Sequence, residues 1–278
     1  MTEINKISSK NPSIKFVCPY DNEIPVRLKK TGKESFYECK ECHRHFPIIN
    51  GIVNFLPDGL REWITIQNNR TNKKVQESND FSGKWKPGFR GWRPNWFVKL
   101  LSIGSGEGRI TSSHRGIVLD VGCGDIAKGD VNTDIYIPSQ IPNNFVLATA
   151  ELLPFMDNSF DIVRSAYVIE HNLYPTEMIK EHFRVCKKRV EIFTDNSDWL
   201  GIYVYRVLNA GSIFHDEHYF KWSKEYFGNI LNRLNIKGKV KVFNTSPSLL
   251  VKFLSLFGVL PRIGVAFYRD LYVEIYKK

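Results

Sequence analysis

Two acidic residues and two glycines near the middle of the chain have the types and spacing of a nucleotide-binding turn. Asp120, Gly122 and Gly124 follow the apolar residues that begin at Ile117, and Asp134 ends a second short apolar run. Glycines at such a turn let the backbone approach a ligand closely. An acid at the end of the next strand can accept hydrogen bonds from both hydroxyls of a ribose. These residues therefore indicate a cofactor that contains a nucleoside.

Three short strands must bring these residues to one edge of a sheet. Residues 117–121 are apolar enough for a central parallel strand, and residues 131–135 and 145–148 follow as the next two strands. Open α/β sheets bind ligands at the carboxyl ends of such strands. Asp134 follows Asp120 by only 14 residues. This connection is too short for a full crossover helix, so we expect the first helix to be cut to a turn or two or lost.

The next part of the chain resembles a known family. The runs Thr149-Ala-Glu151-Leu-Leu-Pro-Phe, Asp157-Asn-Ser-Phe-Asp and Glu170-His171 appear in order. They closely resemble class I S-adenosylmethionine-dependent methyltransferases, in particular the group that contains the ubiquinone and menaquinone biosynthesis enzymes. Over residues 116–278 this resemblance implies an α/β fold with a doubly wound, mostly parallel, seven-stranded Rossmann-like sheet. It fits helices near 176–187 and 221–234 and strands near 189–194, 239–244 and 269–276.

The resemblance also implies roles for individual residues. The methionine part of S-adenosylmethionine would be lined by Asp120, Gly122 and Gly124, the ribose bound by Asp134, and the adenine flanked by Thr149, Ala150 and Glu151. Many relatives have an adenine-binding Asp where this chain has Thr149. His171 follows the fourth strand, where it is either a general base facing the transferred methyl group or a residue that caps the strand.

A second set of candidate ligands lies near the N-terminus. Cys18, Cys39 and Cys42 have the spacing of a zinc ribbon, in which two turns supply the four ligands of a tetrahedral ion. Asp21 stands where the second Cys of the first turn is expected. The fourth ligand is therefore Asp21, His43 or His45, unless the ribbon has lost its metal.

The tail of this N-terminal segment, residues 46–57, carries a further resemblance. It is similar to the zinc-ribbon modules that serve as activator subunits of methyltransferases or are fused ahead of them, including ribosomal-RNA guanine-N1 methyltransferases. Residues 1–58 are therefore predicted to form a small zinc-ribbon-like domain that holds a structural zinc.

The positive charge is concentrated between these two parts. The formal net charge is +10, and residues 59–115 carry eleven basic and four acidic side chains together with four of the six tryptophans. Basic residues interleaved with aromatic ones are typical of surfaces that bind nucleic acid or another anionic partner, and also of a cap packed on a larger domain. We interpret 59–115 as a basic, Trp-rich linker or cap ahead of a methyltransferase domain at 116–278.

The acceptor of the methyl group is less clearly marked. Enzymes that methylate exocyclic amino groups of nucleobases carry Asn/Asp-Pro-Pro-aromatic after the fourth strand, where this chain reads Arg164-Ser-Ala-Tyr167. An apolar run at 249–258 fits a lid over a lipid-like or glycan acceptor, or a packing helix. The polar cluster at 215–219 has three alternative interpretations: it faces the acceptor, it binds a metal, or it forms the turn that begins a helix.

We therefore expect an S-adenosylmethionine-dependent methyltransferase with a small-molecule, lipid or saccharide acceptor, anionic in view of the basic segment. One alternative is an RNA methyltransferase acting on a ring nitrogen or a ribose. The other is a catalytically inactive binding or adaptor protein on the same fold.

Composition is that of an ordinary globular chain. Apolar residues make up 42% and charged residues 24% of the sequence, which excludes disordered and fibrous classes. The start of the chain lacks the apolar core of a signal peptide, and no stretch approaches the ~20 apolar residues of a membrane span. Five cysteines, an odd number, argue against a disulfide framework. These features predict a soluble, cytoplasmic protein.

Overall fold

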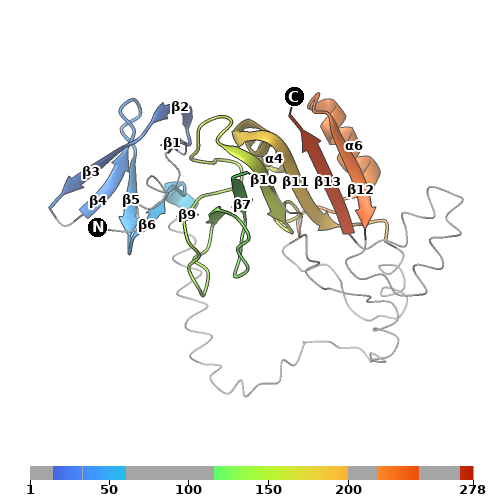
Figure 1. Cartoon of the computed structure of the whole chain (residues 1–278), viewed down its shortest axis with the longest axis horizontal. Helices are drawn as coiled ribbons and strands as arrows, with labels where there is room; N and C mark the ends of the chain where they lie inside the picture. The colour runs from blue at the N-terminus through green and yellow to red at the C-terminus, as the bar shows by residue number, and fades with distance from the viewer. Residues whose placement is uncertain (1–14, 33, 61–115, 200–217, 244–269, 278) are drawn as a thin grey trace, which may run out of the picture.

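The computed structural model describes residues 15–32, 34–60, 116–199, 218–243 and 270–277 (Figure 1). Within these residues, an eleven-stranded sheet carries two α-helices, and β1 and β2 form a separate two-stranded sheet. The elements are β1 (Val17–Cys18), β2 (Asp21–Pro25), β3 (Arg27–Thr31), β4 (Glu34–Glu38), β5 (His45–Ile49), β6 (Ile52–Asn54), β7 (Val118–Val121), β8 (Val131–Asp134), β9 (Phe145–Leu147), β10 (Phe160–Ala166), α4 (Pro175–Val185), β11 (Cys186–Asp195), α6 (Lys224–Arg233), β12 (Gly238–Phe243) and β13 (Asp270–Tyr276). The basic segment and the apolar run at 249–258 lie outside the described residues.

The part of the sheet that follows residue 116 has the order β9-β8-β7-β10-β11-β13-β12. Strands β7 to β11 are parallel to their neighbours, and β13 is antiparallel to both β11 and β12. The chain leaves β7 on one side for β8 and β9 and returns on the other side as β10. This reversal of direction is the point at which doubly wound α/β sheets bind ligands. The expected mostly parallel, Rossmann-like architecture is therefore present.

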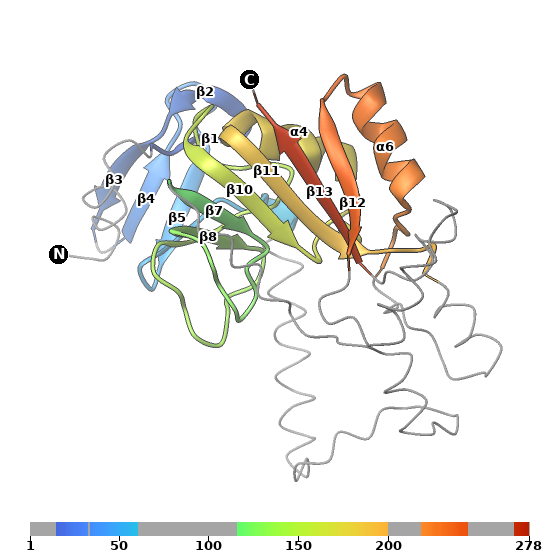
Figure 2. The same cartoon turned by 45° about the vertical axis from the view of Figure 1, so that its right-hand side comes forward.

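The sheet has eleven strands in the described residues: seven follow residue 116, the part for which a seven-stranded sheet was expected, and four N-terminal strands extend it. β6 pairs in parallel with β9, with Val53 opposite Val146, and the Phe55 N–H donates to the Leu147 carbonyl over 2.8 Å. Strands β5, β4 and β3 then continue the sheet in antiparallel fashion. Figures 1 and 2 show these strands at one end of the sheet and β12 with α6 at the other.

Aromatic side chains join the N-terminal strands to the rest of the core. The ring of Phe16 lies 5.2 Å from Phe55 and 5.8 Å from Phe155, and Phe155 meets Phe160 edge-on at 4.9 Å. All four belong to or pack against one apolar cluster that also contains Cys18 and residues of α4 and α6. Aromatic pairs at these separations add stability beyond their buried area. The N-terminal strands and the parallel sheet therefore share a single core.

Two helices pack on the same side of the sheet (Figure 2). α4 buries Met178 and Ile179, and α6 buries Phe227 and Leu231. α6 begins at Ser223, whose side chain accepts a hydrogen bond from the Tyr226 N–H and so caps the helix. Both helices lie where the sequence predicted them, as do β11, β12 and β13.

The first crossover helix is absent. Residues 122–130 join the parallel strands β7 and β8 without any helical residue, and 135–144 do the same between β8 and β9. This confirms the expectation that the short spacing from Asp120 to Asp134 leaves no room for a helix. In the described part of the chain, no helix has the length and apolar character needed to cross a membrane.

Candidate active site

The turn after β7 requires glycine at a specific position. Gly122 has a φ of +69°, and a Cβ built on it would lie 2.3 Å from Cγ2 of Val168. Gly124 also has a positive φ, +51°, but a Cβ there would meet no atom within 4 Å. The N–H groups of Gly122 and Cys123 both donate to the Thr133 carbonyl, at 2.8 and 3.1 Å. The turn is thus fixed on β8 and leaves open space beside its second glycine, as close approach of a cofactor requires.

Asp120 supports the loop behind this turn. Its side chain is buried, and Oδ2 accepts a hydrogen bond of 2.8 Å from the Lys128 N–H. Burial raises the pKa of Asp120, although this bond and the nearby Arg164 guanidinium oppose the shift. Arg164 lies opposite Asp120 in the β7–β10 register and donates to Glu191 from Nε and Nη2. The observed contact is with the loop, and contact of Asp120 with the cofactor stays a prediction.

Asp134 connects the ends of β7 and β8. Its Oδ2 accepts from the Gly124 N–H over 2.9 Å, and its Oδ1 accepts from the Tyr136 N–H over 3.0 Å. Its backbone carbonyl accepts from the Ala148 N–H over 3.1 Å, which ties the end of β9 to the same place. The carboxylate predicted to bind a ribose therefore lies against the glycine turn.

The residues predicted to flank the adenine follow β9 directly. Thr149 and Ala150 are buried and Glu151 is half-buried. Thr149 Oγ1 has no hydrogen-bond partner among the described residues, so it can still bond to a ligand. Glu151 Oε2 accepts a hydrogen bond of 2.8 Å from Asn172 Nδ2, which links this loop to the end of β10.

Arg184 of α4 holds the chain that follows this loop. Its guanidinium donates to the carbonyls of Leu153 and Phe155, at 2.9 and 2.7 Å, and to the carboxylates of Asp157 and Glu181. Several charge-assisted bonds from one planar group fix a loop more firmly than single bonds do. These contacts of Arg184 could not be predicted, because three of its partners are 27 to 31 residues away in the sequence and no local motif indicates them.

Tyr167 turns the chain away from the sheet at the end of β10. It has a φ of +57°, its N–H donates to the Phe193 carbonyl at 2.9 Å, and its hydroxyl hydrogen-bonds Asp270 Oδ1 at 3.0 Å. Non-glycine residues with positive φ are uncommon and are retained where surrounding contacts fix them. The turn brings Glu170 and His171 to the same edge as the glycine turn.

His171 and Glu170 differ sharply in their surroundings. His171 is exposed, and its ring lies perpendicular to that of His218, with the centroids 4.5 Å apart. Glu170 is buried, and burial raises its pKa to about 8, although the hydrogen bond from Thr194 Oγ1 opposes that rise. His171 is the predicted catalytic residue, and Glu170 and His218 are polar neighbours of its side chain. Sequence reasoning marked His218 as part of a polar cluster but did not predict its contact with His171.

The N-terminal cysteines converge as the sequence predicted. The Sγ atoms of Cys18, Cys39 and Cys42 all lie within 4.8 Å of one another, and those of Cys18 and Cys42 are 3.6 Å apart. Burial raises the pKa of Cys18 to about 12. Burial acts in the same direction on Cys42, but hydrogen bonds from Arg44 outweigh it and lower the pKa to about 7. Three converging sulfur atoms fit a thiophilic ion such as zinc, with one position left for a fourth ligand.

The predicted fourth ligands do not join this group. Asp21, His43 and His45 are absent from the set of ligand atoms that meet at the three sulfurs. His45 instead bonds Glu38 Oε1 through Nε2 at 3.1 Å, and its ring packs on Phe36 at 4.4 Å. Asp21 lies opposite Cys18 in the β1–β2 pairing, and the His43 N–H donates to the Cys39 carbonyl over 3.0 Å.

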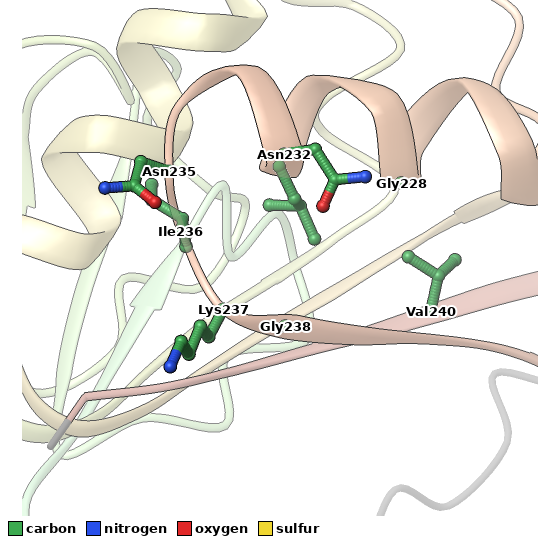
Figure 3. A pocket seen from close by; sticks show the side chains of 8 residues that line it. Gly228, Asn232, Asn235, Ile236, Lys237, Gly238 and Val240 are labelled. Atoms are coloured by element: carbon green, nitrogen blue, oxygen red, sulfur yellow. The ribbon is translucent and has the colours of Figure 1, made fainter.

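A groove of about 410 Å³ lies elsewhere, between the end of α6 and the start of β12 (Figure 3). Asn232, Asn235 and Lys237 line it with polar groups. β12 runs antiparallel to β13, which is itself antiparallel to β11. The start of β12 is therefore at the amino ends of the parallel strands, the edge opposite the glycine turn. Its position separates this groove from the candidate active site.

Comparison with known proteins identifies the region that contains these residues. Residues 101–194 match the family model for a methyltransferase domain, and no curated protein matches the chain. A SAM-dependent methyltransferase from Thermotoga maritima, described as a possible histamine N-methyltransferase, is 19% identical. The alignment covers 59% of this chain and 84% of that one, with a TM-score of 0.42.

Two further solved structures are similar at the same level. A SAM-dependent methyltransferase from Archaeoglobus fulgidus is 18% identical over 58% of this chain and 85% of its own, with a TM-score of 0.41. A complex between the Haloferax volcanii Trm112 methyltransferase activator and the putative methyltransferase is also similar. It is 11% identical over 60% of this chain and 84% of its own, with a TM-score of 0.37. These TM-scores are low, so the assignment depends on the matched domain.

The matched domain contains the candidate cofactor site. It extends from residue 101 to residue 194, within β11. It therefore includes the glycine turn, Asp134, the loop at 149–151 and His171, all at the carboxyl ends of parallel strands. The match of residues 101–194 to a methyltransferase domain identifies the chain as an S-adenosylmethionine-dependent methyltransferase.

Proposed function

We propose that the chain methylates a small-molecule, lipid or saccharide acceptor. The observation that carries this proposal is the charge of the edge where transfer would occur. Among the described residues, the carboxylates of Glu151, Asp195 and Asp270 join Asp134 at or next to the carboxyl ends of β9 and β11 and at the adjoining end of β13. A nucleic-acid backbone would be repelled by such an edge, whereas a small acceptor with one polar group would not.

In this function, the residues at this edge bind the cofactor and position the acceptor. The glycine turn and Asp134 hold the methionine and ribose portions of S-adenosylmethionine, and residues 149–151 flank its adenine. The cofactor, when bound, supplies a methyl group activated by its sulfonium. The protein then has to align the acceptor with that methyl group and exclude water. His171 faces the acceptor, where its imidazole acts as the general base that takes the proton of a hydroxyl.

The N-terminal strands have a structural part in the same proposal. Residues 1–58 form the predicted zinc-ribbon-like unit, and Cys18, Cys39 and Cys42 supply three of the ligands of one zinc. Residues 59–115 steer the acceptor through their positive charge. The metal stabilises the strands that flank β9 and takes no part in methyl transfer.

Transfer of a radiolabelled methyl group distinguishes the acceptor classes. Purified protein and labelled S-adenosylmethionine are incubated with total RNA, with a lipid extract or with a small-molecule extract. We expect label in the lipid or small-molecule fraction. Asp134→Ala should abolish this labelling, because cofactor affinity falls more than about tenfold when two charge-assisted hydrogen bonds are lost.

Glu34→Ala is the matched control, because it removes an exposed carboxylate of β4, and four strands lie between β4 and β7 in the sheet. It should label as the wild type does. Label that enters RNA instead would support the ring-nitrogen or ribose alternative and contradict the proposal.

A further inference from the structure

Three potential metal ligands converge at the acceptor side of the site. One ligand atom from each of Glu170, His171 and His218 lies within 4.8 Å of the others. Glu170 is only 1% exposed. Its Oε2 accepts from Thr194 Oγ1 at 3.0 Å, whereas its Oε1 has no hydrogen-bond partner among the described residues. A buried carboxylate oxygen without a partner is costly, so this atom indicates that a ligand is missing.

The backbone fixes His218 beside Glu170. The carbonyl of Glu170 accepts hydrogen bonds from the N–H groups of Tyr219, at 2.9 Å, and Phe220, at 3.3 Å. These bonds clamp the segment that follows His218 onto the end of β10. The convergence of the three side chains is therefore built into the fold and does not depend on exposed side chains alone.

A carboxylate also lies close to the ring of His218. Nδ1 of His218 lies 3.9 Å from Oδ2 of Asp195, and both side chains are largely buried, at 6% and 14% exposure. Ligand histidines typically direct one ring nitrogen to a carboxylate, which leaves the other nitrogen for the metal. At 3.9 Å this contact is longer than a hydrogen bond, but the Asp195 carboxylate is close enough to favour a positive charge beside His218.

We propose that Glu170, His171 and His218 bind a divalent cation at the carboxyl end of β10, and that this cation holds an oxygen of the methyl acceptor. Two imidazoles and one carboxylate are a donor set for zinc, iron(II) or manganese with open positions for a substrate. Ligand atoms around such an ion are about 3–3.5 Å apart. Because His171 is exposed, rotation of its side chain can close the set.

This inference rests on the proposed small-molecule class of acceptor and narrows it to acceptors with a hydroxyl that can bind a metal. Bound to the cation, the hydroxyl loses its proton to water more readily. Its oxygen then forms a bond to the methyl carbon while the carbon–sulfur bond of the sulfonium breaks. The sulfur keeps the electron pair and leaves as a neutral thioether. His171 acts as a ligand here, and the cation supplies the acidity that a base would otherwise provide.

Manganese binding to the full-length chain tests the site directly. Mn²⁺ favours oxygen and nitrogen donors over thiolates, so it avoids the cysteine cluster. Titration followed by electron paramagnetic resonance should give about one bound Mn²⁺ per chain. His218→Ala and the near-isosteric Glu170→Gln should each weaken binding more than about tenfold.

Cys39→Ser is the control for this titration, and it should bind Mn²⁺ as the wild type does. S-adenosylmethionine binding, measured by calorimetry on every variant, reports whether the protein is folded and whether the cofactor site works. Cofactor binding without Mn²⁺ binding in the wild type, or equal Mn²⁺ binding by all variants, overturns the cation site and leaves the proposed function intact. Label found in RNA would instead contradict the proposed acceptor class, whatever the Mn²⁺ result.

Discussion

Because Gly122 has no Cβ, the turn after β7 can pack against Val168. The side chain of Val168, which follows the end of β10, occupies the space where a Cβ of Gly122 would be. Because this contact joins the turn after β7 to the turn after β10, the cofactor side and the acceptor side of the edge are packed against each other. A substitution of Gly122 or Val168 should therefore disturb both turns.

Replacing Gly122 by alanine should lower both stability and cofactor affinity. The clash with Val168 should cost about 1–3 kcal/mol of unfolding free energy, and the positive φ about 1 kcal/mol more. Urea unfolding and calorimetry with S-adenosylmethionine measure the two effects. Gly124→Ala is the matched control, since it has the same sign of φ and no contact at its Cβ.

The control should lose only about 1 kcal/mol, and Val168→Ala in the Gly122→Ala background should recover part of the larger loss. Equal losses at the two glycines would show that Val168 is not responsible.

Cys39 offers a test of the N-terminal metal. Protein purified without added metal should contain about one zinc per chain, and Cys39→Ser should lose it, because a hydroxyl is a much poorer zinc ligand than a thiolate. Elemental analysis measures the content. Cys186→Ser serves as a control at a buried cysteine that is not one of the three converging ligands. Absence of zinc from the wild type, with the strands folded, would identify the cysteines as packing residues.

At the scale of single elements, α4 both holds the chain at Leu153 and Phe155 and contains a buried titratable group. His182 lies on the buried face of this helix and has no exposed surface. Burial lowers the pKa of His182 to about 4, and the Met178 carbonyl, one turn earlier, opposes this only weakly because its geometry is too poor for a full hydrogen bond. The neutral ring is therefore the form that fits the helix.

Stability should consequently fall on acidification. The pKa of His182 is lower in the folded chain than the ~6.5 of an unfolded one, so its contribution is complete above pH 6.5 and is lost as the pH falls towards 4. Over this interval the free energy of unfolding should fall by about 3 kcal/mol. Urea unfolding at several pH values should show this loss, and His182→Leu should reduce the slope in that interval. An unchanged slope in the variant would assign the acid sensitivity to other groups.

The elements themselves were largely predictable, whereas their long-range pairings were not. The predicted helix at 176–187 is α4, at 175–185, and the missing first helix follows from a count of residues between Asp120 and Asp134. Local composition and spacing contain that information. The pairing of β6 with β9 and the approach of His218 to His171 depend on residues far apart in sequence, and no local pattern encodes them.

The same distinction applies to the candidate site. The glycine turn, Asp134 and residues 149–151 were chosen by motif and do lie at one edge of the sheet. That the Asp134 carboxylate bonds the turn's own N–H group, and that Asp21 lies outside the sulfur group, are matters of side-chain geometry. The division of the chain at residue 58 stays a prediction, as does the function of the basic segment.

For the molecule as a whole, the N-terminal strands extend the sheet next to β9, which leads into the loop at 149–151. β6 covers the outer side of β9, and Phe16 and Phe55 cover Phe155. A chain that lacks residues 1–60 should therefore expose both an unpaired strand and an aromatic surface. Such edges pair with other chains, so we expect the truncated protein to aggregate and to lose cofactor binding.

Size-exclusion chromatography and calorimetry check this expectation. Removal of residues 1–14, which precede β1, is the matched control and should leave the protein monodisperse and able to bind S-adenosylmethionine. A soluble, cofactor-binding protein without residues 1–60 would show that the N-terminal strands are an independent addition.

The parallel pairing of β6 with β9 also bears on how the chain folds. Val53 and Val146 are separated by about ninety residues, so this contact closes a long loop and forms late and slowly. During synthesis the N-terminal strands emerge well before the strand that they flank. They can form their own hairpins first and then serve as a template on which β9 docks. Refolding should accordingly be slower than for a methyltransferase domain whose sheet ends at β9.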